Sequence, residues 1–228
     1  MMKKAAAADH TLSRLASAYM RAKRHVIEAG YAYEIDWQDT VAFDSVTERD
    51  FLREAAWVVL SCGMRESVVR SKFPAISLAF LDWESAEQIV AHRRACYKAA
   101  LRYFNHQKKI EAIVEIAEHV LESKFPVVRN SVQREGVDYL MQLPFMGPAT
   151  SRHLAKNIGL SMAKPDRHLM RIATEAGYGS PQLMCGDIAA LVGDKVAVVD
   201  LVLWRYATLD KNYLDLFLFM TGKQGNVI

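Results

Sequence analysis

A single carboxylate in a basic stretch is the residue of this sequence with the clearest chemical potential. Asp166 is the only acidic residue between Gly147 and Arg171. The basic and histidine side chains around it are Arg152, His153, Lys156, Lys164, Arg167, His168 and Arg171. An isolated acid in such surroundings suggests a phosphate-rich ligand whose reactive centre becomes cationic. Because Asp is also a favoured N-cap, the structural alternative is that Asp166 only begins a helix.

The segment before Asp166 predicts a helical hairpin that binds phosphate. Pro144 and Gly147 lie between two short helical patterns, the first with Leu140 and Leu143 and the second with Leu154 and Ala155. A tight turn that leads into a helix presents backbone N–H groups at the helix N-terminus, where phosphate binds without side-chain chemistry. Arg152 and Lys156, four residues apart, would extend this contact on one helix face. A hairpin that merely packs is the alternative, and the segment by itself favours neither.

The elements that must position these residues are predicted to be helices, roughly ten in an all-α fold. Capping signals support this prediction at Thr47–Asp50, Ser85–Gln88 and Ser180–Pro181. Residues 31–43 are expected to form an irregular connection. Besides the hairpin, the expected helices cover residues 10–29, 48–60, 65–73, 86–104, 108–123, 131–142, 167–176, 181–192 and 195–209.

The length and amino-acid composition of the chain limit the classes of protein to which it can belong. The 228 residues, with 51% hydrophobic side chains and a net charge of +3, fit one large or two small globular domains. No apolar run approaches the length of a membrane span, and the N-terminus is too weakly apolar for a signal peptide. Cys62, Cys96 and Cys185 lack metal-ligand spacing. We therefore expect reduced thiols, no metal site and an intracellular protein, cytoplasmic or nucleoid-associated, without membrane contact.

The hairpin and Asp166 together resemble the helix-hairpin-helix (HhH-GPD) superfamily of DNA glycosylases, which includes endonuclease III and the adenine-mismatch and 3-methyladenine glycosylases. The likeness extends over residues 48–175 and is most specific in the hairpin and the segment after it. Residues that match the family's hairpin and aspartate motifs are Leu143, Pro144, Met146, Gly147 and Thr150, then Asp166, His168, Leu169, Arg171 and Ile172.

This resemblance implies a two-lobed all-α fold. One lobe would comprise residues 45–160 and end in the hairpin, and the other would combine residues 1–44 with 161–228 and carry Asp166. A base flipped from double-stranded DNA would be excised by hydrolysis of its N-glycosidic bond, with Asp166 stabilising the charge on the sugar. Met64 or Arg65 would fill the gap left in the duplex, and the protein would act as a monomer. The expected DNA contacts are Met146, Gly147, Ala149, Thr150, Arg152, Lys156, Arg167 and His168.

Departures from the family pattern narrow this expectation. Ala149 stands where bifunctional members carry the lysine that attacks the sugar, which favours a monofunctional glycosylase that uses water. Lys164 is the alternative nucleophile, and it would give lyase activity. Phe145 replaces the first hairpin glycine, and the cysteine cluster that binds iron–sulphur is missing. No cofactor is expected, although the family's hairpin often holds a monovalent cation through carbonyl oxygens. A non-catalytic helix-hairpin-helix DNA-binding protein is the alternative function.

Overall fold

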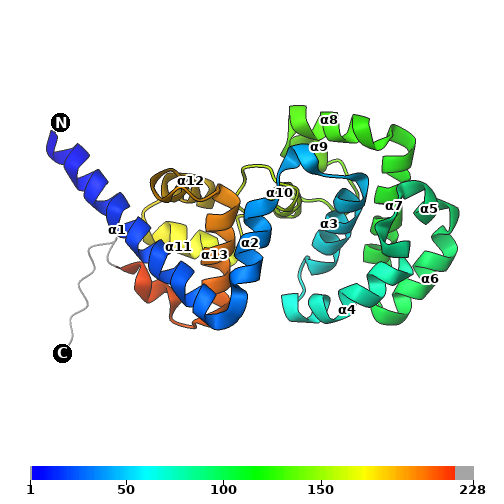
Figure 1. The fold of residues 1–228 in the computed structure, drawn as a ribbon, viewed down its shortest axis with the longest axis horizontal. Helices are drawn as coiled ribbons and strands as arrows, with labels where there is room; N and C mark the ends of the chain where they lie inside the picture. Colours follow the sequence, from blue (N-terminus) through cyan, green and yellow to red (C-terminus); the bar gives the residue numbers. More distant parts are fainter. Residues whose placement is uncertain (1, 219–228) are drawn as a thin grey trace. The chain divides into compact units, whose positions relative to one another are not determined.

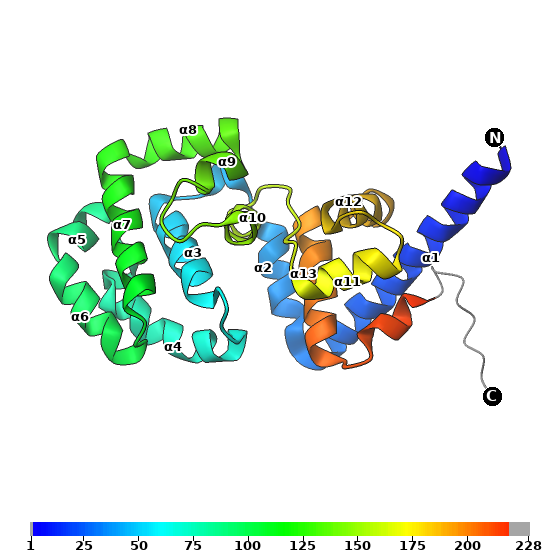
Figure 2. The ribbon, with the colours of Figure 1, turned by 180° about the vertical axis from the view of Figure 1, so that it is seen from behind.

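The computed structural model describes residues 2–218, and the regular secondary structure of these residues is entirely helical (Figures 1 and 2). The all-α class predicted from the sequence is therefore confirmed for this part of the chain. The chain divides into two compact units. One is Ala42–Leu160, and the other is formed by the described parts of Met1–Val41 and Ser161–Ile228. No described helix combines the length and the apolar character that a bilayer crossing requires.

The unit built from the two ends of the chain is organised around α13 (Val196–Leu209). Four helices pack against α13, as Figure 1 shows: α1 (Met2–Val26), α2 (Ala32–Thr40), α11 (Arg167–Glu175) and α12 (Pro181–Val192). Val199 and Val202 on α13 are completely buried, together with Tyr19 on α1 and Ile188 on α12. A helix surrounded in this way is apolar on most of its faces, which explains the weak periodicity of α13. The segment Ile27–Tyr31 joins α1 to α2 and is kinked at Gly30, which has φ +88°. The 3₁₀ turn Tyr213–Leu216 follows α13.

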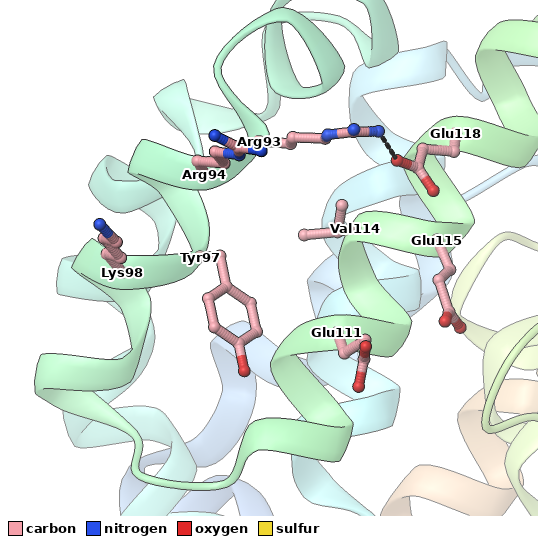
Figure 3. Close-up of a pocket in the computed structure, with 8 residues that line it drawn as sticks. All are labelled: Arg93, Arg94, Tyr97, Lys98, Glu111, Val114, Glu115 and Glu118. Carbon is pink, nitrogen blue, oxygen red and sulfur yellow. Dashed lines mark hydrogen bonds and ion pairs between the residues drawn. The ribbon is translucent and has the colours of Figure 1, made fainter.

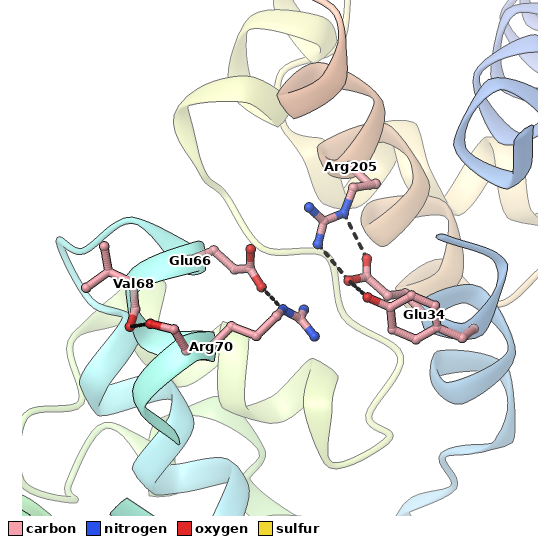
Figure 4. A network of polar contacts seen from close by, with 7 residues as sticks. Glu34, Glu66, Val68, Arg70 and Arg205 are labelled. Carbon is pink, nitrogen blue, oxygen red and sulfur yellow. Dashed lines mark hydrogen bonds and ion pairs between the residues drawn. The ribbon is translucent and has the colours of Figure 1, made fainter. Parts of the chain in front are cut away.

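Helix α2 corrects the expectation that residues 31–43 form an irregular connection. The element is helical from Ala32 to Thr40, and its inward side carries Glu34 and Gln38 beside Ile35. Glu34 forms a bidentate ion pair with Arg205 of α13, with N–O distances of 2.9 and 2.6 Å (Figure 4). Because two of its inward residues are polar, α2 lacks the apolar stripe by which a helix is recognised in a sequence.

The unit Ala42–Leu160 places α3 (Glu48–Ser61) and α7 (Gln107–Ser123) against each other, with the remaining helices packed around this pair. The predicted capping box of α3 is present: Thr47 accepts from the Asp50 N–H, and Asp50 accepts from the Thr47 N–H. In the core of this unit, the Trp83 ring stacks with the rings of Phe73 and Phe80, with centroids 5.9 and 5.0 Å apart. The other elements are 3₁₀ turns Phe43–Ser45 and Leu81–Trp83, and helices α4 (Glu66–Ala79), α5 (Ala86–Ala91), α6 (Arg93–Tyr103), α8 (Phe125–Glu135), α9 (Val137–Leu140) and α10 (Pro148–Asn157).

Three predicted helix boundaries in this unit are wrong. Helix α4 continues through Pro74, because Phe73 and Ile76 on either side are buried and their packing offsets the lost hydrogen bond. The single helix predicted over residues 86–104 is broken at His92 into α5 and α6. The helix predicted over residues 131–142 is replaced by α8 and α9, which meet at Gly136 with φ +61°. Glycine adopts this backbone conformation readily.

Gly159 determines how α10 ends and where the chain leaves this unit. Its φ is +90°, and a Cβ at this position would lie 2.6 Å from the Phe43 nitrogen. The Leu160 N–H donates to the Ala155 carbonyl, which closes a glycine-type helix C-cap. Only glycine fits here without displacing the backbone of the neighbouring turn. The segment that leads to Asp166 therefore starts from a fixed point.

Candidate nucleic-acid interface and carboxylate site

The hairpin lies in the unit Ala42–Leu160 and consists of α9, a tight turn over residues 141–147, and α10. The Met146 N–H donates to the Leu143 carbonyl at 3.2 Å, and Phe145 between them has φ +65°. Gly147 is the N-cap of α10 and Pro148 its first residue. Since Gly147 has no side chain to cap the helix, the first N–H groups of α10 are left for another acceptor. This is the local geometry that an anion requires.

The predicted DNA contacts of the hairpin differ in their exposure. Gly147 and Ala149 are exposed, and Arg152 is half-buried with its guanidinium donating to the Pro148 carbonyl at 3.2 Å. Met146, Thr150 and Lys156 are buried. Arg152 and Lys156 are thus not an exposed pair, and the exposed part of the hairpin is its turn and the first residues of α10.

Lys156 belongs to a buried polar group that joins α10 to α3. Glu54 on α3 is only 6% exposed, and its carboxylate accepts from the Asn157 amide at 2.9 Å. Burial raises the pKa of Glu54, while the positive charges of Arg53 and Lys156 act in the opposite direction. These contacts fix α10 on α3, and thereby fix the base of the hairpin.

The predicted wedge residues lie on the turn between α3 and α4. Met64 and Arg65 are exposed, Gly63 has φ +68°, and the Met64 N–H closes the turn on the Ser61 carbonyl at 3.1 Å. Cys62 in the same turn lies beside the hairpin, because the Thr150 hydroxyl reaches its sulphur at 3.9 Å. The structure thus brings the turn and the hairpin together within one unit.

Asp166 lies in the other unit and is the N-cap of α11. Its Oδ1 accepts both the His168 N–H at 2.8 Å and the Leu169 N–H at 2.9 Å. Among residues 2–218, no hydrogen bond reaches Oδ2. The half-buried carboxylate therefore uses one oxygen to begin the helix and keeps the other for a further contact.

Two side chains hold the loop that leads to Asp166. The Ala163 N–H donates to the Gln182 side-chain oxygen at 2.7 Å. The Lys164 N–H donates to Asp200 Oδ1 at 2.6 Å, and Asp200 is 1% exposed in the middle of α13. Pro165 adds a fixed φ just before Asp166. A polypeptide segment without regular structure is in this way anchored to the core of its unit.

His168 and Arg167 follow Asp166 on α11. Arg167 is exposed and donates from Nε to His168 Nε2 at 3.2 Å, while His168 is half-buried and packs edge-on against Tyr213 at 5.4 Å. Its Nδ1 is buried without a hydrogen-bond partner in the described part of the chain. Burial lowers the pKa of His168, with Arg167 and Arg171 acting in the same direction and Asp166 against it. The lowered pKa favours the neutral form of the ring, and Arg167 beside it is a cation at this end of α11.

A shallow groove of about 330 Å³ lies between α6 and α7 (Figure 3). One side carries Arg93, Arg94 and Lys98, and the other carries Glu111, Glu115 and Glu118. Arg93 already bridges the two sides through Glu118 at 2.9 Å. Because the acidic side repels phosphate, this groove does not extend a nucleic-acid surface.

The prediction of no metal site and of a possible monovalent cation concerns the side chains and carbonyls that could act as ligands. Within the described residues, no group of three or more His, Cys, Asp or Glu side chains is placed to hold a metal ion. The hairpin carbonyls of Leu143, Gly147 and Pro148 already accept hydrogen bonds from within the chain, so a monovalent cation would share these oxygens. Comparison of the sequence with protein-family models and with curated proteins finds no match.

Sequence reasoning missed three residues that organise these sites: Lys109, Gln182 and Asp200. Lys109 had a detectable signal, because it occupies the position four residues before Ile113 on the apolar stripe of α7. Asp200 stands between apolar residues in the sequence, a position that is typical of a helix-start or salt-bridge residue. In the structure the Asp200 carboxylate instead accepts the backbone N–H of Lys164, 36 residues away in the sequence.

Proposed function

We propose that this protein is a DNA N-glycosylase of the helix-hairpin-helix type, which excises a damaged, mismatched or modified base from double-stranded DNA. The proposal rests on the resemblance of the hairpin and Asp166 motifs to that superfamily. Asp166 would be the catalytic carboxylate, and water would be the nucleophile. The hairpin, through Gly147 and Ala149, and the exposed Arg167 would bind phosphates of the DNA backbone.

The structural observation that carries the proposal is that the two carboxylate oxygens of Asp166 differ in their hydrogen bonds. Its Oδ1 is fixed by two backbone N–H groups, which hold the carboxylate in one orientation. Its Oδ2 accepts no hydrogen bond within the described residues, so it is available to a ligand. A carboxylate that is oriented beforehand stabilises a developing positive charge without the cost of reorganisation.

The reaction would proceed in three steps: base flipping, cleavage of the N-glycosidic bond and attack by water. The target nucleotide is first flipped out of the duplex, and its N-glycosidic bond then breaks with the electron pair leaving on the base. The sugar ring becomes an oxocarbenium ion, and the Asp166 carboxylate stabilises this charge. Water attacks the anomeric carbon, and the proton that it loses passes through solvent to the departing base, which leaves an abasic site on the DNA. Because position 149 is alanine, the position from which bifunctional members of the superfamily form a Schiff base carries no amine here.

Substitution of Asp166 by Asn tests this proposal. Asparagine is also a good N-cap, so the variant keeps the start of α11 while it loses the negative charge. We expect base excision to fall by at least about a hundredfold, since one electrostatic contact to a transition state is worth that much. DNA affinity should change little. The measurement is single-turnover release from duplexes carrying uracil, oxidised guanine, alkylated purines, mismatches or hypermodified pyrimidines.

A matched control is available in the same unit. Asp187→Asn removes an exposed carboxylate whose partner is the Tyr178 hydroxyl, without touching the start of α11. This variant should excise bases at the rate of the unchanged protein. If Asp166→Asn also excises at that rate, Asp166 is not the catalytic carboxylate.

Two alternatives remain with their own tests. A non-catalytic DNA-binding protein is favoured by the fact that N-capping alone accounts for the two hydrogen bonds of Asp166. DNA binding without base release across the whole panel would support it. A glycosylase with lyase activity would use Lys164. Borohydride would then trap a covalent complex with DNA, and the complex would be lost in Lys164→Ala.

A further inference from the structure

Lys109 is a buried lysine at the beginning of α7. Its side chain is 2% exposed, and its ammonium donates to the backbone carbonyls of Leu60, at 2.7 Å, and Cys62. These two carbonyls belong to the end of α3 and the first residue of the turn that carries Met64 and Arg65. A helix C-terminus has unpaired carbonyls and a partial negative charge, so an ammonium is a favourable cap. Fully buried lysines are rare unless their charge is compensated.

The other side of the same ammonium faces two aromatic rings. Lys109 Nζ lies 5.7 Å from the centroid of the Phe145 ring and 5.8 Å from that of Phe104. Both distances lie within the range of a cation–π contact, which strengthens when the cation is removed from water. Phe145 also packs edge-on against His106, with centroids 6.4 Å apart. The hairpin turn thus contacts the Lys109 ammonium through Phe145, the residue that replaces the first glycine of the family's hairpin.

We infer that Lys109 joins the turn over residues 62–65 and the hairpin turn over residues 145–149 into one composite surface that binds a nucleic-acid strand. The two segments are far apart in the sequence, and the buried ammonium contacts both. Their exposed members are Cys62, Gly63, Met64, Arg65, Phe145, Gly147, Pro148 and Ala149. The identification of the ligand as a nucleic acid rests on the proposed function, whereas the coupling between the two turns does not.

The charge of Lys109, and not only its volume, is needed for this role. A methionine would fill the same space, but it could neither donate to the Leu60 and Cys62 carbonyls nor attract the Phe145 ring. Burial lowers the pKa of Lys109, and Cys62 acts in the opposite direction. The two carbonyls and the two rings also contact the ammonium and compensate its charge. Loss of the charge should release both turns at once, whereas loss of the ring alone should release only the hairpin.

The experiment compares three variants of the full chain by hydrogen exchange and by binding to a DNA duplex at several salt concentrations. Lys109→Met removes the ammonium, Phe145→Leu removes only the ring contact, and Lys108→Met removes a neighbouring exposed lysine as a control for charge. We expect faster exchange in Lys109→Met in both turns, over residues 61–66 and 143–150. Phe145→Leu should show it only over 143–150, and Lys108→Met in neither segment.

DNA affinity should fall on the order of tenfold in Lys109→Met, because a binding surface that is no longer preorganised must be ordered by the ligand. The slope of affinity against salt should stay unchanged, since a buried ammonium neutralises no phosphate. Unchanged exchange in Lys109→Met, or an affinity loss accompanied by a smaller salt slope, would overturn the inference. If the unchanged protein binds no duplex, the proposed function fails, and the exchange data still decide whether the two turns are coupled.

Discussion

The Asp200 carboxylate of α13 accepts the backbone N–H of Lys164 at 2.6 Å, two residues before the carboxylate of Asp166. Asp200 is almost completely buried, so this hydrogen bond is formed away from water. Buried polar groups of this kind fix a conformation strongly, because a lost partner leaves the other group unsatisfied. The position of Asp166 therefore depends on a residue of the core helix.

Asp200→Ala should slow base excision without removing any group from the reactive site. The loss of a buried acceptor should destabilise the fold by about 1–3 kcal/mol. Displacement of the Asp166 loop should lower the excision rate by roughly ten- to a hundredfold. Asp200→Asn keeps an acceptor oxygen in place and should retain most of the rate. Single-turnover kinetics and urea unfolding of both variants check this, and a fully active Ala variant would contradict it.

Substitutions of Phe145 should measure the backbone strain in the hairpin turn. A non-glycine residue at φ +65° costs on the order of 1 kcal/mol or more relative to glycine. Phe145→Gly loses the contacts with Lys109 and His106 but relieves this strain, while Phe145→Ala loses the same contacts and keeps the strain. We therefore expect the Gly variant to be more stable than the Ala variant by about 1 kcal/mol. Equal free energies of unfolding for the two variants would show that the turn is unstrained.

Several features that depend on near neighbours in the sequence are predicted correctly. The caps at Thr47 and Ser180 form as predicted, and α12 has its predicted bounds. Asp166 forms the N-cap that its position before a helix favours. In each case the partners are within three residues of each other, so residue type and spacing carry the information.

Beyond the wrong boundaries at Pro74, His92 and Gly136, the failures involve partners that are distant in the sequence. Helix α2 was missed because its buried Glu34 is paired with Arg205, 171 residues later. In the same way, Asp200 and Lys109 are satisfied by backbone groups 36 and 49 residues away. Burial of a charged residue depends on its partner, and periodicity contains no information about such a partner.

His168 makes the pH dependence of stability a test of the site around Asp166. Burial lowers the pKa of His168 in the folded protein below its ordinary value of 6.5. The unfolded chain then binds a proton more readily than the folded one. The contribution of His168 to stability is thus fully present above pH 6.5 and is lost as the pH falls through the two pKa values. The groups that act on it are Arg167 and Arg171, which lower its pKa further, and Asp166, which opposes them.

His168→Phe should remove this dependence. Phenylalanine can retain the edge contact with Tyr213, and it eliminates the unpartnered buried Nδ1, so the variant should be at least as stable as the unchanged protein at pH 7. Its advantage should grow as the pH falls from 7 to 5, because only the unchanged protein must then protonate a buried ring or unfold. His25→Phe is the matched control, since His25 is exposed and makes the same edge contact with Tyr206 at 5.4 Å. Urea unfolding at each pH measures both differences. If the advantage of His168→Phe is the same at pH 5 and pH 7, protonation of His168 is not coupled to folding, and the ring is accessible to water beside Asp166.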